Sequence, residues 1–170
     1  ALFDVLRKYT DKNGNHPIIT ANCVVANPDF EKIKLNNFLN YYYEPFTDTL
    51  KRYKGCENSF ELWKQGMHEG LFKPQFHGRE HLNVARWMKF LQTDTDTRHV
   101  FDHGLMGLFP KGDDIENNFQ RALDDSFYKG QSYWNLLAEG LELFEKIFGY
   151  KSKSFIAPCY TWNPNIEERL

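Results

Sequence analysis

The chain of 170 residues is long enough for one domain with its own hydrophobic core. Apolar residues make up 41% and charged residues 26%, as in ordinary globular proteins, and aromatic residues are frequent at 16%. The formal net charge of −2 comes from acidic and basic residues mixed along the chain, which argues against a nucleic-acid-binding protein.

The first elements in chain order are a predicted helix, a turn and a strand. The opening residues have apolar side chains at helical spacing, at Leu2, Val5, Leu6 and Tyr9. A turn is predicted at 13–15, and the apolar, β-branched run over 18–26 is typical of a buried parallel strand. Asp29 is a candidate cap for the next helix, although the run after it is irregular.

The middle of the chain predicts two helices on either side of a short extended segment. Asn58 or Ser59 is expected to cap the first, because Glu61 follows Asn58 as in a capping box. Residues 71–76 form the extended segment, and its proline is typical of an edge or irregular strand. From Glu80 onward the apolar residues again recur at helical spacing.

The last third is predicted to contain a long loop, three helices and one strand. Residues 93–114 have no clear period and are expected to form the loop, with a short helical or extended piece. Helices are expected over 115–125, over 132–148 and from Asn163 onward, and residues 153–160 are expected to form a strand.

Apolar strands that alternate with helices are typical of an α/β fold with a parallel sheet. Three predicted strands are too few to close a sheet, and the chain opens and stops within helical patterns. We therefore expect a single domain over residues 1–170 that is a portion of a (β/α) barrel. On this interpretation the chain is an interior piece of a longer protein.

His77 and His81 stand where the predicted strand over 71–76 ends. If residues 77–81 form the first turn of a helix, both imidazoles project from one face and can chelate one divalent metal ion, such as zinc. Barrel active sites lie at the carboxyl ends of strands, which favours this interpretation. The alternative is a polar pair at a helix start, and a third ligand has to come from elsewhere.

Other candidate metal-binding and sugar-binding residues have less specific sequence patterns. His99 and His103 repeat the spacing, with Asp102 beside them, and are either a second metal site or part of an exposed loop. Tyr160 and Trp162, and the run over 41–46, are suited to stacking on sugar rings, and ordinary packing is the alternative.

The cysteines Cys23, Cys56 and Cys159 are odd in number and scattered, which argues against a disulfide framework or a cysteine zinc site. A buried structural thiol is the expected state of Cys159. No apolar run is long enough to cross a membrane.

The stretches "FHGREH" and "SFIAPCYTW" resemble the polysaccharide deacetylase superfamily, of the rhizobial chitooligosaccharide-deacetylase type with a distorted (β/α) barrel. The phrases "NGNHPIITAN", "ANPDF" and "PQFHGREHLNV" are similar to those of bacterial polysaccharide deacetylase-like proteins, nearly end to end.

This resemblance implies a metal-dependent hydrolase that removes acetyl groups from a carbohydrate. In the family motif, two histidines bind a divalent metal, with zinc as the expected ion, and they match His77 and His81, whereas Gly78 replaces the family's hydroxyl residue. The backbone N–H of Cys159, after Pro158, matches the oxyanion donor, but the arginine of that motif is absent.

The resemblance also implies that other catalytic groups lie outside this chain. The paired aspartates that supply the base and third ligand precede its start, the acidic histidine follows Leu170, and Asp113 and Asp114 are not credible substitutes. We expect this chain to be inactive alone. The alternatives are a non-catalytic glycan-binding barrel, acting through Tyr160 and Trp162, and a hydrolase of another substrate.

Overall fold

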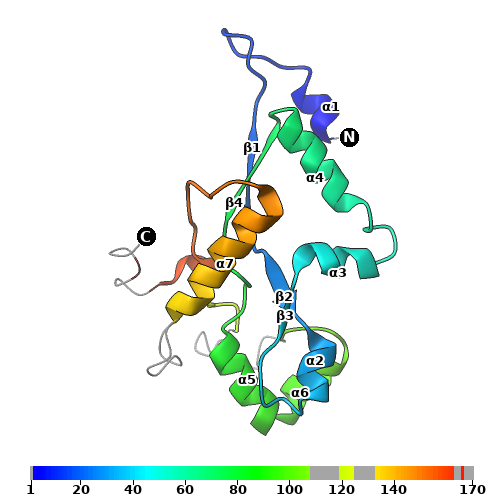
Figure 1. Ribbon diagram of the computed structural model, residues 1–170, viewed down its shortest axis with the longest axis vertical. Coiled ribbons are helices and arrows are strands. Elements are labelled where there is room, and N and C mark those ends of the chain that lie inside the picture. The colour runs from blue at the N-terminus through cyan, green and yellow to red at the C-terminus, as the bar shows by residue number, and fades with distance from the viewer. Residues whose placement is uncertain (1, 108–118, 125–132, 163–165, 167–170) are drawn as a thin grey trace.

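The computed structural model describes residues 2–107, 119–124, 133–162 and 166 (Figure 1). These residues form a mixed α/β fold with two separate two-stranded sheets. The described helices are α1 (Leu2–Leu6), α2 (Phe30–Leu35), α3 (Phe46–Arg52), α4 (Ser59–His68), α5 (Val84–Thr93), α6 (Thr95–Asp102), α7 (Tyr133–Phe148) and the 3₁₀ turn η3 (Pro158–Tyr160). The strands are β1 (Ile19–Cys23), β2 (Ala26–Pro28), β3 (Tyr43–Pro45) and β4 (Phe72–Phe76).

The structure contains the expected parallel pairing, although in a sheet of only two strands. β1 pairs with β4 in parallel, with Ile19 opposite Phe72 and Cys23 opposite Phe76. The expected strand over 153–160 joins this sheet at one point only, a parallel bridge between Phe155 and Phe76. The carboxyl ends of all three segments therefore meet at the same edge, which is where the candidate site lies.

The third segment is attached to β4 by a side chain as well as by backbone. The Gln75 Oε1 atom accepts hydrogen bonds from the backbone N–H groups of Lys153 and Ser154, at 2.8 and 3.0 Å. The Ile156 N–H donates to the Phe76 carbonyl at 3.4 Å. Because Pro158 has no N–H and begins η3, the ladder cannot continue, so this part of the strand prediction is wrong.

The predicted strand over 18–26 is also divided. β1 ends at Cys23, and β2 begins at Ala26 and pairs in the antiparallel sense with β3. Two short sheets replace one continuous sheet, and the described residues contain no closed barrel.

Two hydrophobic cores hold the elements together. The sheet core lies around β1, β4 and α7, and the helical core joins α2, α5 and α6 at the other end of the molecule (Figure 1). Gly140 of α7 lies so close to β4 that an added Cβ atom would come within 2.7 Å of the Phe76 ring. A side chain there would push α7 off the strand.

Helix ends follow the local chemistry of their capping residues. Asp29 caps α2 by accepting from the Lys32 N–H at 3.0 Å, as predicted. Asn58 occupies the N-cap of α4 without a side-chain cap bond, so the predicted capping box is wrong. The helix expected from Glu80 begins later, at Val84, because the Asn83 side chain accepts from the Arg86 N–H and fixes the start.

Helix α6 lies within residues 93–114, which were expected to form a loop with a short helical or extended piece, and its composition is mostly polar. Asp94 caps α6 by accepting from the Thr97 N–H at 2.7 Å, and Val100 and Phe101 are buried. Residues 119–124 form turns in place of the expected helix, whose remaining residues lie outside the described part of the chain. The helix expected from Asn163 also lies outside it.

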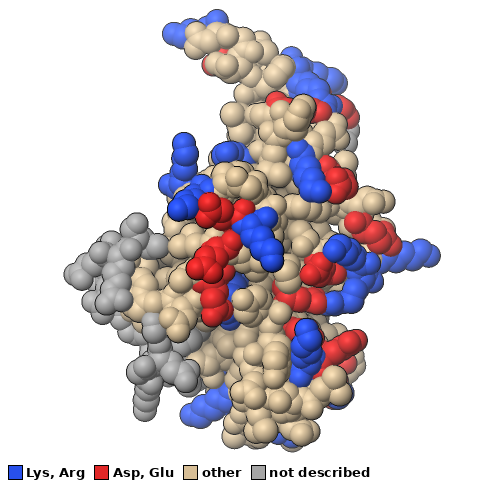
Figure 2. Space-filling model, in the orientation of Figure 1, with Lys and Arg blue, Asp and Glu red and all other residues tan. Residues whose placement is uncertain are grey.

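Acidic and basic side chains are interspersed on the face drawn in Figure 2. Within the described residues, no helix combines the length and apolar character needed to span a membrane.

Candidate metal site at the end of β4

His77 and His81 lie together at the carboxyl edge of the parallel sheet. The His77 N–H donates to the Cys23 carbonyl at 2.9 Å, so the sheet pairing extends one residue beyond β4. The centroids of the two imidazole rings are 5.2 Å apart. The predicted proximity is therefore confirmed, within reach of one shared metal ion.

A turn at Gly78 brings the two rings together, so the expected helical turn over 77–81 is wrong. Gly78 has φ of 117°, a conformation that side chains on L-residues rarely adopt. An added Cβ atom would lie 3.3 Å from both the Glu80 carbonyl oxygen and the Pro158 ring. This explains why glycine occupies the position where the resembling family carries a hydroxyl residue.

A backbone carbonyl fixes the tautomer of His77. The His77 Nδ1 atom lies 2.6 Å from the carbonyl oxygen of Ile156. Because a carbonyl can only accept, the hydrogen is on Nδ1, and the lone pair of the neutral ring is on Nε2. Histidine ligands of metal ions are commonly oriented by such a bond. The third segment of the sheet thus fixes the orientation of the His77 ring.

The surroundings of His81 favour its neutral form. Burial and, to a smaller extent, the neighbouring charge of His77 lower the pKa of His81 below its usual value. Because a metal ligand must be a neutral imidazole, this shift favours coordination over protonation.

A buried ion pair between the two histidines supports the loop, and the pattern analysis missed it. The Arg79 Nε–H donates to Glu80 Oε1 at 2.7 Å, and Arg79 also pairs with Glu139 of α7. The Tyr41 hydroxyl donates to the same Glu80 oxygen at 2.9 Å, and the Arg79 guanidinium lies 4.2 Å from the Tyr43 ring centroid.

The two members of this pair are almost fully enclosed, with 7% and 1% of their side chains exposed. Burial raises the pKa of Glu80, and the adjacent Arg79 opposes that shift. The Arg79 carbonyl accepts from the N–H groups of Val25 and Ala26, which ties the loop to the end of β1. No spacing rule predicts that two neighbouring opposite charges are buried, so this cluster could not be found from residue patterns.

The aromatic residues of the run over 41–46 make contacts within the protein. Tyr41 and Tyr43 contact the buried ion pair, and Phe46 belongs to the sheet core. These contacts favour packing over the sugar-facing patch that was the other interpretation of residues 41–46.

The predicted substrate residues follow Pro158, which lies close to the turn between the histidines. Pro158 touches the Gly78 turn, and the next residues, Cys159 and Tyr160, have φ near 55°. Tyr160 is 80% exposed and Trp162 is 45% exposed, so both rings are accessible for stacking. Burial raises the pKa of the Cys159 thiol, which argues against a thiolate nucleophile at this position.

Arg121 is a further charge near this segment that the pattern analysis did not single out. The positive charge of Arg121 acts on the Cys159 thiol and opposes the rise in its pKa. Arg121 also pairs with Asp124 at 3.5 Å.

The second histidine pair lies apart from this site. His99 and His103 are exposed at the end of α6, with ring centroids 4.7 Å apart. Asp102, between them, pairs with Lys34 at 2.6 Å.

A complete ligand set is not found in the part of the chain that the structure describes. There, no three histidine, cysteine or carboxylate side chains converge on one point. Asp113 and Asp114 lie outside the described residues. The described site therefore contains two neighbouring imidazoles and no third candidate ligand among the described residues.

Comparison of the chain with protein-family models, with curated proteins and with solved structures found no match.

Proposed function

We propose that the chain is part of a metal-dependent hydrolase of the polysaccharide deacetylase type, with His77 and His81 as two metal ligands. The observation that carries this proposal is the hydrogen bond from His77 Nδ1 to the Ile156 carbonyl, beside a second imidazole 5.2 Å away between centroids. That bond leaves Nε2 as the metal-binding atom. A parallel sheet with the pair at its carboxyl edge supports a portion of a (β/α) barrel as the architecture.

The proposed metal is a divalent ion, with zinc as the first choice because both described ligands are imidazoles. Such an ion polarises a carbonyl and lowers the pKa of bound water. The chain's own residues hold and orient it: His77 and His81 donate nitrogen lone pairs, and the backbone N–H of Cys159 is the proposed donor to the oxyanion. The third ligand, the base and the acid are expected outside the described residues.

The proposed substrate is an acetylated glycan. Tyr160 and Trp162 expose aromatic rings beside the histidine turn, and such rings commonly stack on sugars. Their position after Pro158, which touches Gly78, brings sugar and metal to the same edge of the sheet.

The metal content of chain purified without chelator tests the metal part of this proposal. After exhaustive dialysis we expect about one zinc ion per chain to remain. His77→Ala/His81→Ala should lose it, whereas His99→Ala/His103→Ala, a pair with the same spacing, should keep it. Metal-free wild-type protein that takes up no zinc when zinc is added would contradict the assignment.

A non-catalytic glycan-binding barrel is the second candidate. Two observations favour it: Ile156 and Ala157 precede Pro158 where the family has its arginine, and the described residues supply only two ligands. Titration with a chitooligosaccharide, with and without EDTA, separates the two functions. Binding that is unaffected by EDTA but lost in Tyr160→Ala supports the binder, whereas binding that EDTA abolishes and added zinc restores supports the metal-dependent hydrolase.

A further inference from the structure

The exposed histidines at the end of α6 have a geometry that the proposed hydrolase does not use. His99 lies in the last turn of the helix, and His103 is its C-cap residue. Their ring centroids are 4.7 Å apart, closer than those of His77 and His81. Both side chains are exposed, so a hydrated ion can reach them without any opening of the protein.

The orientation of the His103 ring leaves a nitrogen lone pair for a ligand. The His103 Nδ1 atom lies 2.8 Å from the carbonyl oxygen of His99, so Nδ1 carries the hydrogen and Nε2 carries the lone pair. The His103 backbone N–H donates to the Val100 carbonyl at 3.1 Å. Two contacts with the helix end therefore hold the residue in place, which lowers the entropy cost of binding.

The electrostatic surroundings favour a cation. The carbonyl end of a helix carries partial negative charge, and α6 ends at these residues. Asp102 adds a carboxylate between the two histidines, and it pairs with the Lys34 ammonium at 2.6 Å. The Lys34 ammonium offsets part of this negative charge, so the attraction is modest.

We propose that His99 and His103 form a second, exposed site for a divalent transition metal ion of borderline softness, such as Cu²⁺, Ni²⁺ or Zn²⁺. Two imidazoles bind the ion and water fills its remaining positions. The site is separate from His77 and His81, lies in the helical core's half of the molecule, and does not depend on the proposed hydrolase function.

The two histidine sites differ in how they should select metals. A pair with open positions imposes little geometry, so its affinities should follow the intrinsic order for imidazole, with Cu²⁺ above Ni²⁺ and Zn²⁺. The exposed ion should also exchange quickly and be removed by a brief EDTA wash. His77 and His81 are half-buried, and an ion there should leave more slowly.

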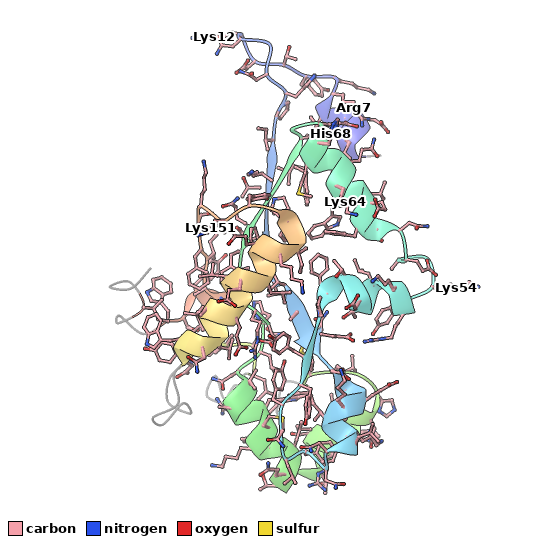
Figure 3. All side chains as sticks on the ribbon, in the orientation of Figure 1. Arg7, Lys12, Lys54, Lys64, His68 and Lys151 are labelled. Carbon is pink, nitrogen blue, oxygen red and sulfur yellow. The ribbon has the colours of Figure 1, made fainter. Side chains whose placement is uncertain are left out.

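Titration of metal-stripped protein with Ni²⁺ tests the proposal. His99→Ala and His103→Ala should each weaken one binding event by roughly tenfold or more, since even residues that only orient metal ligands have effects of this size. His68→Ala is the matched control, because His68 is an exposed histidine on α4 at the opposite end of the molecule (Figure 3). It should leave this event unchanged.

A site-resolved readout keeps the test independent of any folding defect. In unaltered protein, paramagnetic Ni²⁺ should broaden the side-chain NMR signals of His99 and His103 before those of His16 and His68. The event should persist in His77→Ala/His81→Ala, which separates it from the proposed zinc site. Equal broadening of all four signals, or affinities unchanged in both variants, would overturn the proposal.

Discussion

Two histidine pairs with identical spacing occupy very different settings in this chain. His77 and His81 follow a strand, are half-buried and flank an ion pair that is nearly inaccessible to water. His99 and His103 end a short helix in contact with solvent, beside an exposed ion pair between Asp102 and Lys34. In both pairs the rings come within about 5 Å, although one pair is joined by a glycine turn and the other by a helix.

The difference shows that spacing alone does not define a metal site. What distinguishes the first pair is support from distant parts of the chain: the Ile156 carbonyl orients His77, and Cys23 and Pro158 fix the turn. The second pair is supported only by its own helix. Contacts from distant parts of the fold hold a site rigidly. Catalysis requires such rigidity, whereas metal binding at an exposed surface site does not.

The largest expected difference concerns the carboxylate inside each pair. Glu80→Gln leaves the buried Arg79 charge without its buried partner and should lower the free energy of unfolding by about 3 kcal/mol. Asp102→Asn breaks an exposed pair and should cost about 0.5 kcal/mol. Urea denaturation of both variants measures the contrast. Equal losses would mean that the Arg79–Glu80 pair is no more important than a surface pair.

A smaller difference in stability is expected when the glycine next to each pair is replaced: Gly78, which follows His77, and Gly104, which follows His103. Gly78→Ala forces a side chain into a left-handed turn against Pro158 and should cost about 2 kcal/mol. Gly104 has φ of 71° and open space around it, so Gly104→Ala should cost only about 1 kcal/mol. Thermal unfolding of the two variants compares them. A larger loss at Gly104 would contradict the close contact between Gly78 and Pro158.

The smallest expected difference is in how pH affects the N-caps of two helices. Asp94 caps α6, which carries His99, and Asn83 caps α5, which follows His81. Two hydrogen bonds from Thr97 lower the pKa of Asp94, the cap of α6, below its ordinary value of 3.8. Its stabilisation is therefore complete above that ordinary value and is lost as the pH falls through the lower, folded-state pKa. Asp94→Ala should cost about 1 kcal/mol at pH 7 and progressively less below pH 4.

Asn83, the cap of α5, provides the control for this pH dependence. Its amide does not titrate, and it also donates to the Arg121 and Asp124 carbonyls at 3.2 and 3.0 Å. The loss in Asn83→Ala should stay constant from pH 7 to pH 3. Unfolding free energies of both variants at each pH decide the point, and a cost for Asp94→Ala that does not change with pH would contradict it.

Elements with a strong local signal could be predicted from the sequence. The apolar stripe of α7 and the β-branched run of β1 each fixed an element to within a few residues, and the parallel pairing of β1 with β4 followed from strand–helix alternation. The proximity of His77 and His81 was also predictable from their spacing. In these cases the periodicity of the apolar residues within one segment agrees with the structure that the segment adopts in the fold.

The rest depended on contacts between distant residues. Within 93–114 the sequence predicted only a short helical or extended piece and could not place α6, because its apolar positions are few and its cap, Asp94, lies in a run of alternating threonine and aspartate. The Gly78 turn depends on Pro158, and the burial of Arg79 and Glu80 depends on Tyr41, Tyr43 and α7. Such partners are far apart in sequence, so no local window contains the signal.

The attachment of the third sheet segment through Gln75 has a kinetic consequence. A segment joined by one backbone bridge and otherwise by side-chain hydrogen bonds has few backbone bonds to break, so residues 152–158 should open as a unit well below the free energy of global unfolding. Each opening removes the Ile156 carbonyl from His77 and frees that ring to change tautomer. Amide hydrogen exchange in this segment would therefore report how often His77 loses the orientation that suits it to hold a metal ion.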